Sequence, residues 1–239
     1  MWYIIPDTHG RDNWKEQLHF FNPDIDSVIF LGDYLDPYPG EVSKEDAICN
    51  FESIIDFKNK YKEKVILLIG NHDCPYIFTE YKNSMSYLCR FDSEHYKDIE
   101  NLFKETEFKF THTINVNDKT VLFSHAGVLD DWYNLKDILE LEEFCKTNLI
   151  RLCEVSRYRG GIDSCGSIVW ADVYEHVARR YNNNSSIFQI FGHTYSKVPI
   201  LTSNFAMLDA GSKYYAVLDR CLLRIRDSSF NNTVSTFII

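Results

Sequence analysis

The sequence predicts an α/β fold with parallel strands at its N-terminal end. Short apolar segments at residues 2–5, 28–31 and 65–69 have the composition of buried strands. An amphipathic pattern over residues 44–60 predicts a helix, and Ser43 precedes it as a capping residue. Strands that alternate with helices in this way lie parallel in one sheet.

The same patterns predict the remaining elements. Trp14, Leu18 and Phe21 recur at helical spacing, so a first helix is expected from residue 12 or 13 to about residue 21. Further elements are a hairpin at 108–116 and 119–124, a helix at 135–152, a functional loop at 154–167, a polar connection at 182–186, and strands at 187–191, 205–209, 214–218, 221–226 and 233–238. No internal repeat or domain boundary is visible, so one domain is expected across residues 1–239.

Composition limits the classes of function. The chain has 239 residues, of which 45% are apolar, which is enough for a large buried core. A formal net charge of −10 disfavours a general nucleic-acid surface. The seven cysteines form no CxxC pair, which favours a reducing compartment. The apolar start ends at Asp7, unlike a signal peptide, and no run approaches the roughly 18 apolar residues of a membrane span. We therefore expect a cytoplasmic protein with no membrane partner.

Five of the apolar strands end in polar segments rich in Asp, His and Asn. Open α/β sheets place their ligand sites at the carboxyl ends of strands, so these side chains are expected to meet at one place. The segments are Asp7-Thr8-His9-Gly10, Gly32-Asp33-Tyr34-Leu35-Asp36, Gly70-Asn71-His72-Asp73, Ser124-His125-Ala126-Gly127 and Gly192-His193-Thr194. Any one of them alone has a simple structural explanation, such as a turn or a buried histidine. Together they predict a site.

These ligand types suit divalent metals such as Mn, Fe or Zn. A single carboxylate can bridge two ions through its two oxygens, and Asp33 is the candidate. Two ions about 3.5–4 Å apart can hold a bridging hydroxide, which attacks a phosphoryl group that both ions clamp. The predicted ligands are Asp7, His9 and Asp33 for one ion, and Asp33, Asn71, His125 and His193 for the other.

His72 remains outside this ligand set. It is predicted to protonate the leaving oxygen as a catalytic acid, with Asp36 as the hydrogen-bond partner that orients it.

In this order, the five motifs resemble those of calcineurin-like metallophosphoesterases. Val169-Trp170-Ala171-Asp172 is similar to a Trp-containing segment of the phosphoprotein phosphatases, and the stretch from Phe191 to Gly211 is similar to the end of a bacteriophage phosphatase. The resemblance implies a four-layer α-β-β-α sandwich, two divalent or trivalent metal ions, with Mn²⁺ first and Fe or Zn as alternatives, and hydrolysis of a phosphoester. The ligand roles above match those of the family.

Two positions depart from the phosphatase pattern. Phosphatases of this type carry an Arg directly after the second motif, where this chain has Pro37, and often a second Arg where it has Ile69. Arg157 and Arg159 in the loop 154–167 are the predicted substitutes that bind the substrate phosphate.

The first functional hypothesis is a phosphatase for phosphomonoesters of small molecules or phosphoproteins. The second is a phosphodiesterase or dinucleoside polyphosphate hydrolase. The third is a non-catalytic scaffold of the same fold, which usually loses ligands or the catalytic His. Every predicted ligand and His72 are present here, so an enzyme is favoured.

Overall fold

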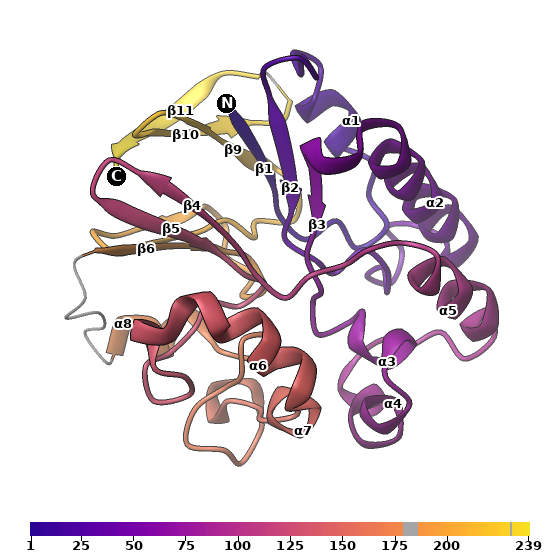
Figure 1. Ribbon diagram of the computed structural model, residues 1–239. Coiled ribbons are helices and arrows are strands. Elements are labelled where there is room, and N and C mark those ends of the chain that lie inside the picture. The colour runs from indigo at the N-terminus through magenta and orange to yellow at the C-terminus, as the bar shows by residue number, and fades with distance from the viewer. Residues whose placement is uncertain (179–185, 230) are drawn as a thin grey trace.

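The computed structural model contains two β-sheets that pack face to face (Figure 1). It describes residues 1–178, 186–229 and 231–239. In the larger sheet the strands follow the order β11-β10-β9-β1-β2-β3. Their bounds are β1 Trp2–Ile5, β2 Ser27–Phe30, β3 Val65–Leu67, β9 Tyr214–Asp219, β10 Leu222–Asp227 and β11 Thr233–Ile238.

The second sheet follows the order β4-β5-β6-β8-β7. Its strands are β4 His112–Val116, β5 Lys119–Phe123, β6 Ile187–Phe191, β7 Ile200–Leu201 and β8 Phe205–Met207. Both sheets are mixed: β1, β2 and β3 run parallel to one another, as do β5, β6 and β8, and antiparallel strands complete each sheet.

Helices cover the outer face of each sheet (Figure 1). The α-helices are α1 Trp14–Gln17, α2 Lys44–Tyr61, α3 Cys74–Ile77, α4 Thr79–Met85, α5 Tyr96–Lys104, α6 Leu141–Thr147, α7 Leu149–Leu152 and α8 Val173–Ala178. Helices α1, α2 and α5 pack on the first sheet, and α6, α7 and α8 lie on the side of the second. The predicted α-β-β-α sandwich is confirmed.

The parallel strands β1, β2 and β3 are almost wholly apolar, and both of their faces are buried. In β1, Ile4 faces the second sheet, while Tyr3 and Ile5 face α2. This alternation has the period of two that a strand imposes. On the helix side, Phe51 of α2 is fully buried against the same layer. Burial on both faces fixes the register of the parallel strands, and with it the position of every loop that follows them.

Two predicted helices are shorter than expected. The first spans only four residues, and Asn13 before it makes no side-chain cap. A helix this short has little stability of its own. The segment 135–152 forms a 3₁₀ turn at Leu135–Glu140 followed by α6 and α7. Asn148 separates these two helices because its side-chain amide donates to the Phe144 carbonyl (2.9 Å) and its backbone leaves the helical region.

Other boundaries differ by a few residues. The predicted strands 65–69, 108–116 and 205–209 are each shorter in the structure. The hairpin at Asn117 is confirmed, with Asn117 in the left-handed region. The polar connection predicted at 182–186 falls almost wholly outside the described residues. Among the residues that the structure describes, no helix is long and apolar enough to cross a membrane.

Helix α2 gives a test of the capping prediction. The Ser43 hydroxyl accepts a hydrogen bond from the Asp46 amide (3.0 Å), which satisfies one free N–H of the first turn. Ser43→Ala should lower the free energy of unfolding by about 1 kcal/mol in urea denaturation. Ser53→Ala in the middle of the same helix is the control, and it should be neutral or slightly stabilising. Equal effects of the two changes would contradict the cap.

Candidate metal centre

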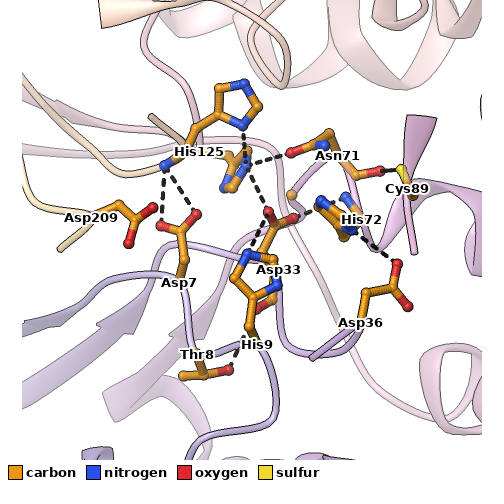
Figure 2. Close-up of polar contacts among 12 residues, drawn as sticks. Asp7, Thr8, His9, Asp33, Asp36, Asn71, His72, Cys89, His125 and Asp209 are labelled. Atoms are coloured by element: carbon orange, nitrogen blue, oxygen red, sulfur yellow. Dashed lines mark hydrogen bonds and ion pairs between the residues drawn. The ribbon is translucent and has the colours of Figure 1, made fainter. Parts of the chain in front are cut away.

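Asp33 lies at the centre of the strand-end loops (Figure 2). Its Oδ2 atom is 3.6 Å from Nε2 of His9 and 3.4 Å from Nε2 of His125. Two groups of buried side chains bring ligand atoms within 4.8 Å of one another, namely His9, Asp33 and His72, and Asp33, His125 and His193. Asp33 belongs to both groups, as a bridging carboxylate must.

The ring nitrogens that face this centre are arranged as acceptors. Nδ1 of His9 lies 3.0 Å from the Leu35 carbonyl, and Nδ1 of His125 lies 2.9 Å from the Leu31 carbonyl. A carbonyl can only accept, so each Nδ1 carries a proton. Nε2 of His9 therefore presents a lone pair, and Nε2 of His125 presents one once that ring has lost its second proton. These lone pairs point towards Asp33. A cation between them would resolve the contact of acceptors with acceptors, so the donor set fits a metal.

The His125 side of the centre has the same character. Nε2 of His125 is 2.9 Å from Oδ1 of Asn71 and 3.1 Å from Nδ1 of His193. Nε2 of His193 is buried and has no hydrogen-bond partner among the described residues. The predicted set for the second ion is therefore brought together by the structure.

Asp7 is buried at the same centre but makes different contacts. Both of its oxygens accept from the His193 amide, at 3.1 and 3.0 Å. It falls in neither of the two groups above, and His72 is the third member beside His9 and Asp33. The predicted role of Asp7 as a ligand stays a prediction.

Two motif glycines let the backbone approach the carboxylates. A Cβ atom at Gly70 would lie 2.1 Å from Oδ1 of Asp33, and one at Gly192 would lie 1.9 Å from Oδ1 of Asp7. Real Cβ atoms do not approach oxygen so closely, so these positions require glycine.

Four side chains of the centre stand on strained backbone. His9, Asp33, Asp36 and His193 have φ angles of 46°, 56°, 59° and 68°. The left-handed region costs roughly 1–2 kcal/mol for such residues. Their clustering at one site is typical of a functional constraint.

Asp73 holds two of the loops together. Its Oδ2 atom accepts from the amides of Asp33 and Gly70, both at 2.8 Å, and its Oδ1 atom accepts from the Tyr34 amide at 3.1 Å. One fully buried carboxylate thus links the loop after β2 to the loop after β3.

Charge is unevenly distributed in the centre. Burial opposes ionisation of Asp33, but the positive charges of His125 and His72 hold the pKa of Asp33 well below its usual range. Burial favours neutral His125, yet Asp33 and Asp7 outweigh it and raise the pKa of His125 to about 9. Burial lowers the pKa of His9 to about 3. The pKa of Asp7 is raised by burial and by Asp209, which is a strain that bound cations would relieve.

His72 belongs to a chain of hydrogen bonds that leads away from the centre. Its Nδ1 atom lies 2.9 Å from Oδ2 of Asp36, as predicted from the sequence. The hydroxyl of Tyr76 donates to the other oxygen of Asp36 (2.6 Å) and accepts from the Asp92 amide (2.7 Å). Tyr76 was not predicted. It follows the third motif closely, but nothing in its residue type signals this contact.

The structure separates the two predicted arginines. Nη1 of Arg159 lies 3.7 Å from Oδ2 of Asp172. Together with burial, the charge of Arg159 lowers the pKa of His193, so this guanidinium is near the centre. Arg157 is exposed, and its Nε atom donates to the Ile162 carbonyl. Their roles in substrate binding stay predictions.

A third arginine lies beside the centre and was missed. Nη2 of Arg90 is 3.3 Å from Nδ1 of His9. Arg90 comes from the stretch 76–104, which carries no motif. Trp170, by contrast, is only 3% exposed and its indole N–H donates to the Tyr81 hydroxyl, so it belongs to the core.

Comparison with known proteins identifies the family. The family model for calcineurin-like phosphoesterases matches residues 3–197, which is most of the chain. The chain belongs to the calcineurin-like phosphoesterase family. Members bind divalent metals and hydrolyse phosphoesters, and the His and Asp groups described above suit such ions.

A curated relative is similar to this chain in sequence. The chain is 26% identical over 194 residues to the serine/threonine-protein phosphatase PP1-delta of Caenorhabditis elegans. The match covers 79% of this chain and 55% of that protein, so the chain spans little more than half the length of this relative.

Solved structures share the fold. Yfce, a phosphoesterase from E. coli, superposes with a TM-score of 0.53 at 13% identity, over 100% of this chain and 98% of that one. A protein serine/threonine phosphatase from Saccharomyces cerevisiae, similar to human PP5, gives 0.51 at 14% identity, over 100% of this chain and 79% of that one.

Substitution of Asp33 tests whether it is shared between two ions. Asp33→Asn removes the charge that both ligand groups have in common, so both ions should be lost or bound far more weakly. Metal analysis by mass spectrometry after dialysis would measure this. Asp130→Asn, an exposed residue, is the control. Retention of two ions by Asp33→Asn would argue against bridging.

Metal affinity should depend on pH. His125 has a pKa of about 9 in the metal-free protein and must lose its proton to act as a ligand. Lowering the pH from 8 to 6 should therefore weaken apparent Mn²⁺ affinity, by up to about tenfold per pH unit for that proton. Calorimetry at several pH values measures this. His112→Asn should leave the slope unchanged, because the pKa of His112 is lowered to about 4 and this residue stays neutral throughout. An affinity independent of pH would contradict the prediction.

Proposed function

We propose that the protein is a phosphatase that uses two metal ions to hydrolyse phosphomonoesters. The observation that carries the proposal is the position of Asp33 in two overlapping groups of potential ligands, one of which includes His72. When bound, the two ions would supply positive charge and a nucleophile for in-line displacement at phosphorus. Mn²⁺ is the proposed ion.

The chain itself would provide the scaffold for these ions. Asp7, His9 and Asp33 are the proposed ligands of one, and Asp33, Asn71, His125 and His193 those of the other. The backbone carbonyls of Leu31 and Leu35 fix the tautomers of His125 and His9, so that each ring offers the correct nitrogen.

His72 would deliver a proton to the leaving oxygen. Asp36 accepts at Nδ1 of His72, which leaves Nε2 as the atom that can hold and release this proton. Tyr76 acts one step further away, because its hydroxyl holds Asp36 in place. Asp36 and Tyr76 are therefore positioning residues, and His72 is the proposed catalytic acid.

The relationship to serine/threonine phosphatases favours a monoester substrate, either a phosphoprotein or a small molecule. A panel of phosphopeptides, small phosphomonoesters, phosphodiesters and dinucleoside polyphosphates, assayed with added Mn²⁺, tests the proposal. Monoester hydrolysis at the highest rate is expected. Preference for diesters or dinucleoside polyphosphates would favour the second hypothesis, a phosphodiesterase or polyphosphate hydrolase. Metal binding without turnover would favour the third, a non-catalytic scaffold.

Leaving-group dependence tests the acid. A positioned proton donor contributes about 10²–10⁴ in rate when the leaving group is poor, as in an alkyl phosphate. p-Nitrophenolate leaves with little help. His72→Asn should therefore reduce kcat for an alkyl phosphate far more than for p-nitrophenyl phosphate.

Two further variants serve as graded controls. Asp36→Asn and Tyr76→Phe should show the same selectivity with smaller losses, because they disturb the orientation of His72 and leave its ring present. Metal content must be measured in each, since His72 lies within reach of Asp33. Equal losses on both substrates, with metals retained, would refute the acid role.

A further inference from the structure

The side chains around the centre, taken without metal ions, are unfavourable for an anionic substrate. Asp7, Asp33 and Asp209 are all buried there, in a chain of net charge −10. A phosphomonoester dianion brings two more negative charges, and its non-bridging oxygens need donors. A cation of the chain that lies close to the ligands, and whose charge is not already neutralised, would add to the positive charge that the two ions of the proposed function supply.

Most arginines near the centre have other partners. Arg11 forms an ion pair with Glu41, with Nε and Nη2 at 3.0 and 2.5 Å from one carboxylate oxygen. Arg159 faces Asp172. Within the described ranges, no carboxylate forms an ion pair with Arg90, so its charge is uncompensated by a direct partner.

Arg90 is held in place through one edge and one face of its guanidinium. Nε lies 2.9 Å from the Asp36 carbonyl and 3.2 Å from the Pro37 carbonyl, and donates to both. Cζ lies 3.9 Å from the centroid of the Tyr38 ring, a distance typical of a cation–π contact. Tyr38 in turn packs edge-on against the ring of His9 (5.1 Å). These contacts reduce the freedom that the side chain would lose on binding a ligand.

The terminal nitrogens of Arg90 keep donors for a ligand. Nη2 approaches Nδ1 of His9 at 3.3 Å, but the proton on that nitrogen is directed at the Leu35 carbonyl. Two donors that face each other form no hydrogen bond, so this contact leaves Nη2 unsatisfied. Nη2 of Arg90 thus lies beside Nδ1 of His9, on the opposite side of the imidazole ring from Nε2, the proposed ligand atom.

We infer that Arg90 binds the non-bridging oxygens of the substrate phosphoryl group and selects phosphomonoester dianions over diesters. This inference rests on the proposed function, because it places the substrate at the same centre. A guanidinium fork recognises two oxygens of a terminal phosphoryl group, whereas a diester has only one charge and a second substituent in the way. Pro37 contributes only its carbonyl, which anchors Nε.

Calorimetry and kinetics on metal-loaded protein test the role. The proteins to be compared are wild type, Arg90→Ala and Arg90→Lys, and inorganic phosphate is the binding probe. The two substrates are p-nitrophenyl phosphate and bis(p-nitrophenyl) phosphate. Arg90→Ala should raise the phosphate Kd and the monoester KM roughly 10- to 100-fold, which is the loss expected for a charge-assisted contact. Diester kcat/KM should change far less. Arg90→Lys should be intermediate, because an ammonium keeps the charge and loses the fork.

Arg224→Ala is the matched control. This substitution also removes one positive charge, but at a partly exposed arginine of β10 that forms an ion pair with Asp219. Asp219 follows Leu218, the register partner of Trp2 at the start of β1, so this site is at the opposite end of the strand from Asp7. Phosphate affinity and both KM values should stay at the wild-type level.

Several outcomes would overturn the inference. One is an unchanged phosphate Kd in Arg90→Ala with metals retained. Another is loss of metal with equal damage to both substrates, which would make Arg90 a structural brace. If Arg90→Ala does not fold, an unchanged phosphate Kd in Arg90→Lys decides against it. A third is a raised phosphate Kd in the double variant Arg157→Ala, Arg159→Ala, while Arg90→Ala binds phosphate as tightly as wild type. Failure of wild type to hydrolyse any ester would refute the proposed function, and the phosphate Kd values would still test Arg90.

Discussion

The candidate centre depends on the hydrogen bonds that the buried carboxylate of Asp73 accepts from backbone amides. Three backbone amides from two different loops donate to it, and one of them belongs to Asp33, which stands on left-handed backbone. Together with the hydrogen bond from the His72 amide to Oδ1 of Asp33 (2.9 Å), this anchor joins the loops after β2 and β3. Without it, the strained conformation at Asp33 would lose much of its support. The anchor in turn depends on the parallel register of β2 and β3, which the buried apolar faces fix.

The centre is built to receive positive charge. Ring nitrogens of His9 and His125 face the carboxylate of Asp33, and ring nitrogens of His125 and His193 face each other. Such an arrangement is costly in a buried site unless cations occupy it. Burial and the neighbouring Asp209 raise the pKa of Asp7, and Asp33 and Asp7 raise the pKa of His125 against the effect of burial. In the metal-free protein, protons therefore partly balance the negative charge of the carboxylates. Metal binding and proton release are therefore linked.

The substrate side of the site draws on a different part of the chain. Arg90 reaches His9 from the segment between α4 and α5, far from any motif, and Tyr76 braces Asp36 from α3. Both side chains also contact the loop at residues 36–38, which carries Asp36, Pro37 and Tyr38. This loop links the position of the proposed acid to the position of the proposed phosphate contact.

The sequence alone predicted the parallel opening of the fold, the meeting of His and Asp side chains around Asp33, and the pairing of His72 with Asp36. The first two features follow from local patterns, namely continuous apolar runs and polar residues directly after each of them. The pairing was predicted from the positions of the second and third motifs. The sequence did not reveal Arg90 or Tyr76, because neither belongs to a strand-end motif. It also did not reveal the orientation of Asp7, whose oxygens accept from a backbone amide 186 positions away. Nor did it reveal the break at Asn148, where a side chain competes for a helix carbonyl. Tertiary packing decided these features, since only the folded chain sets which donors and acceptors meet.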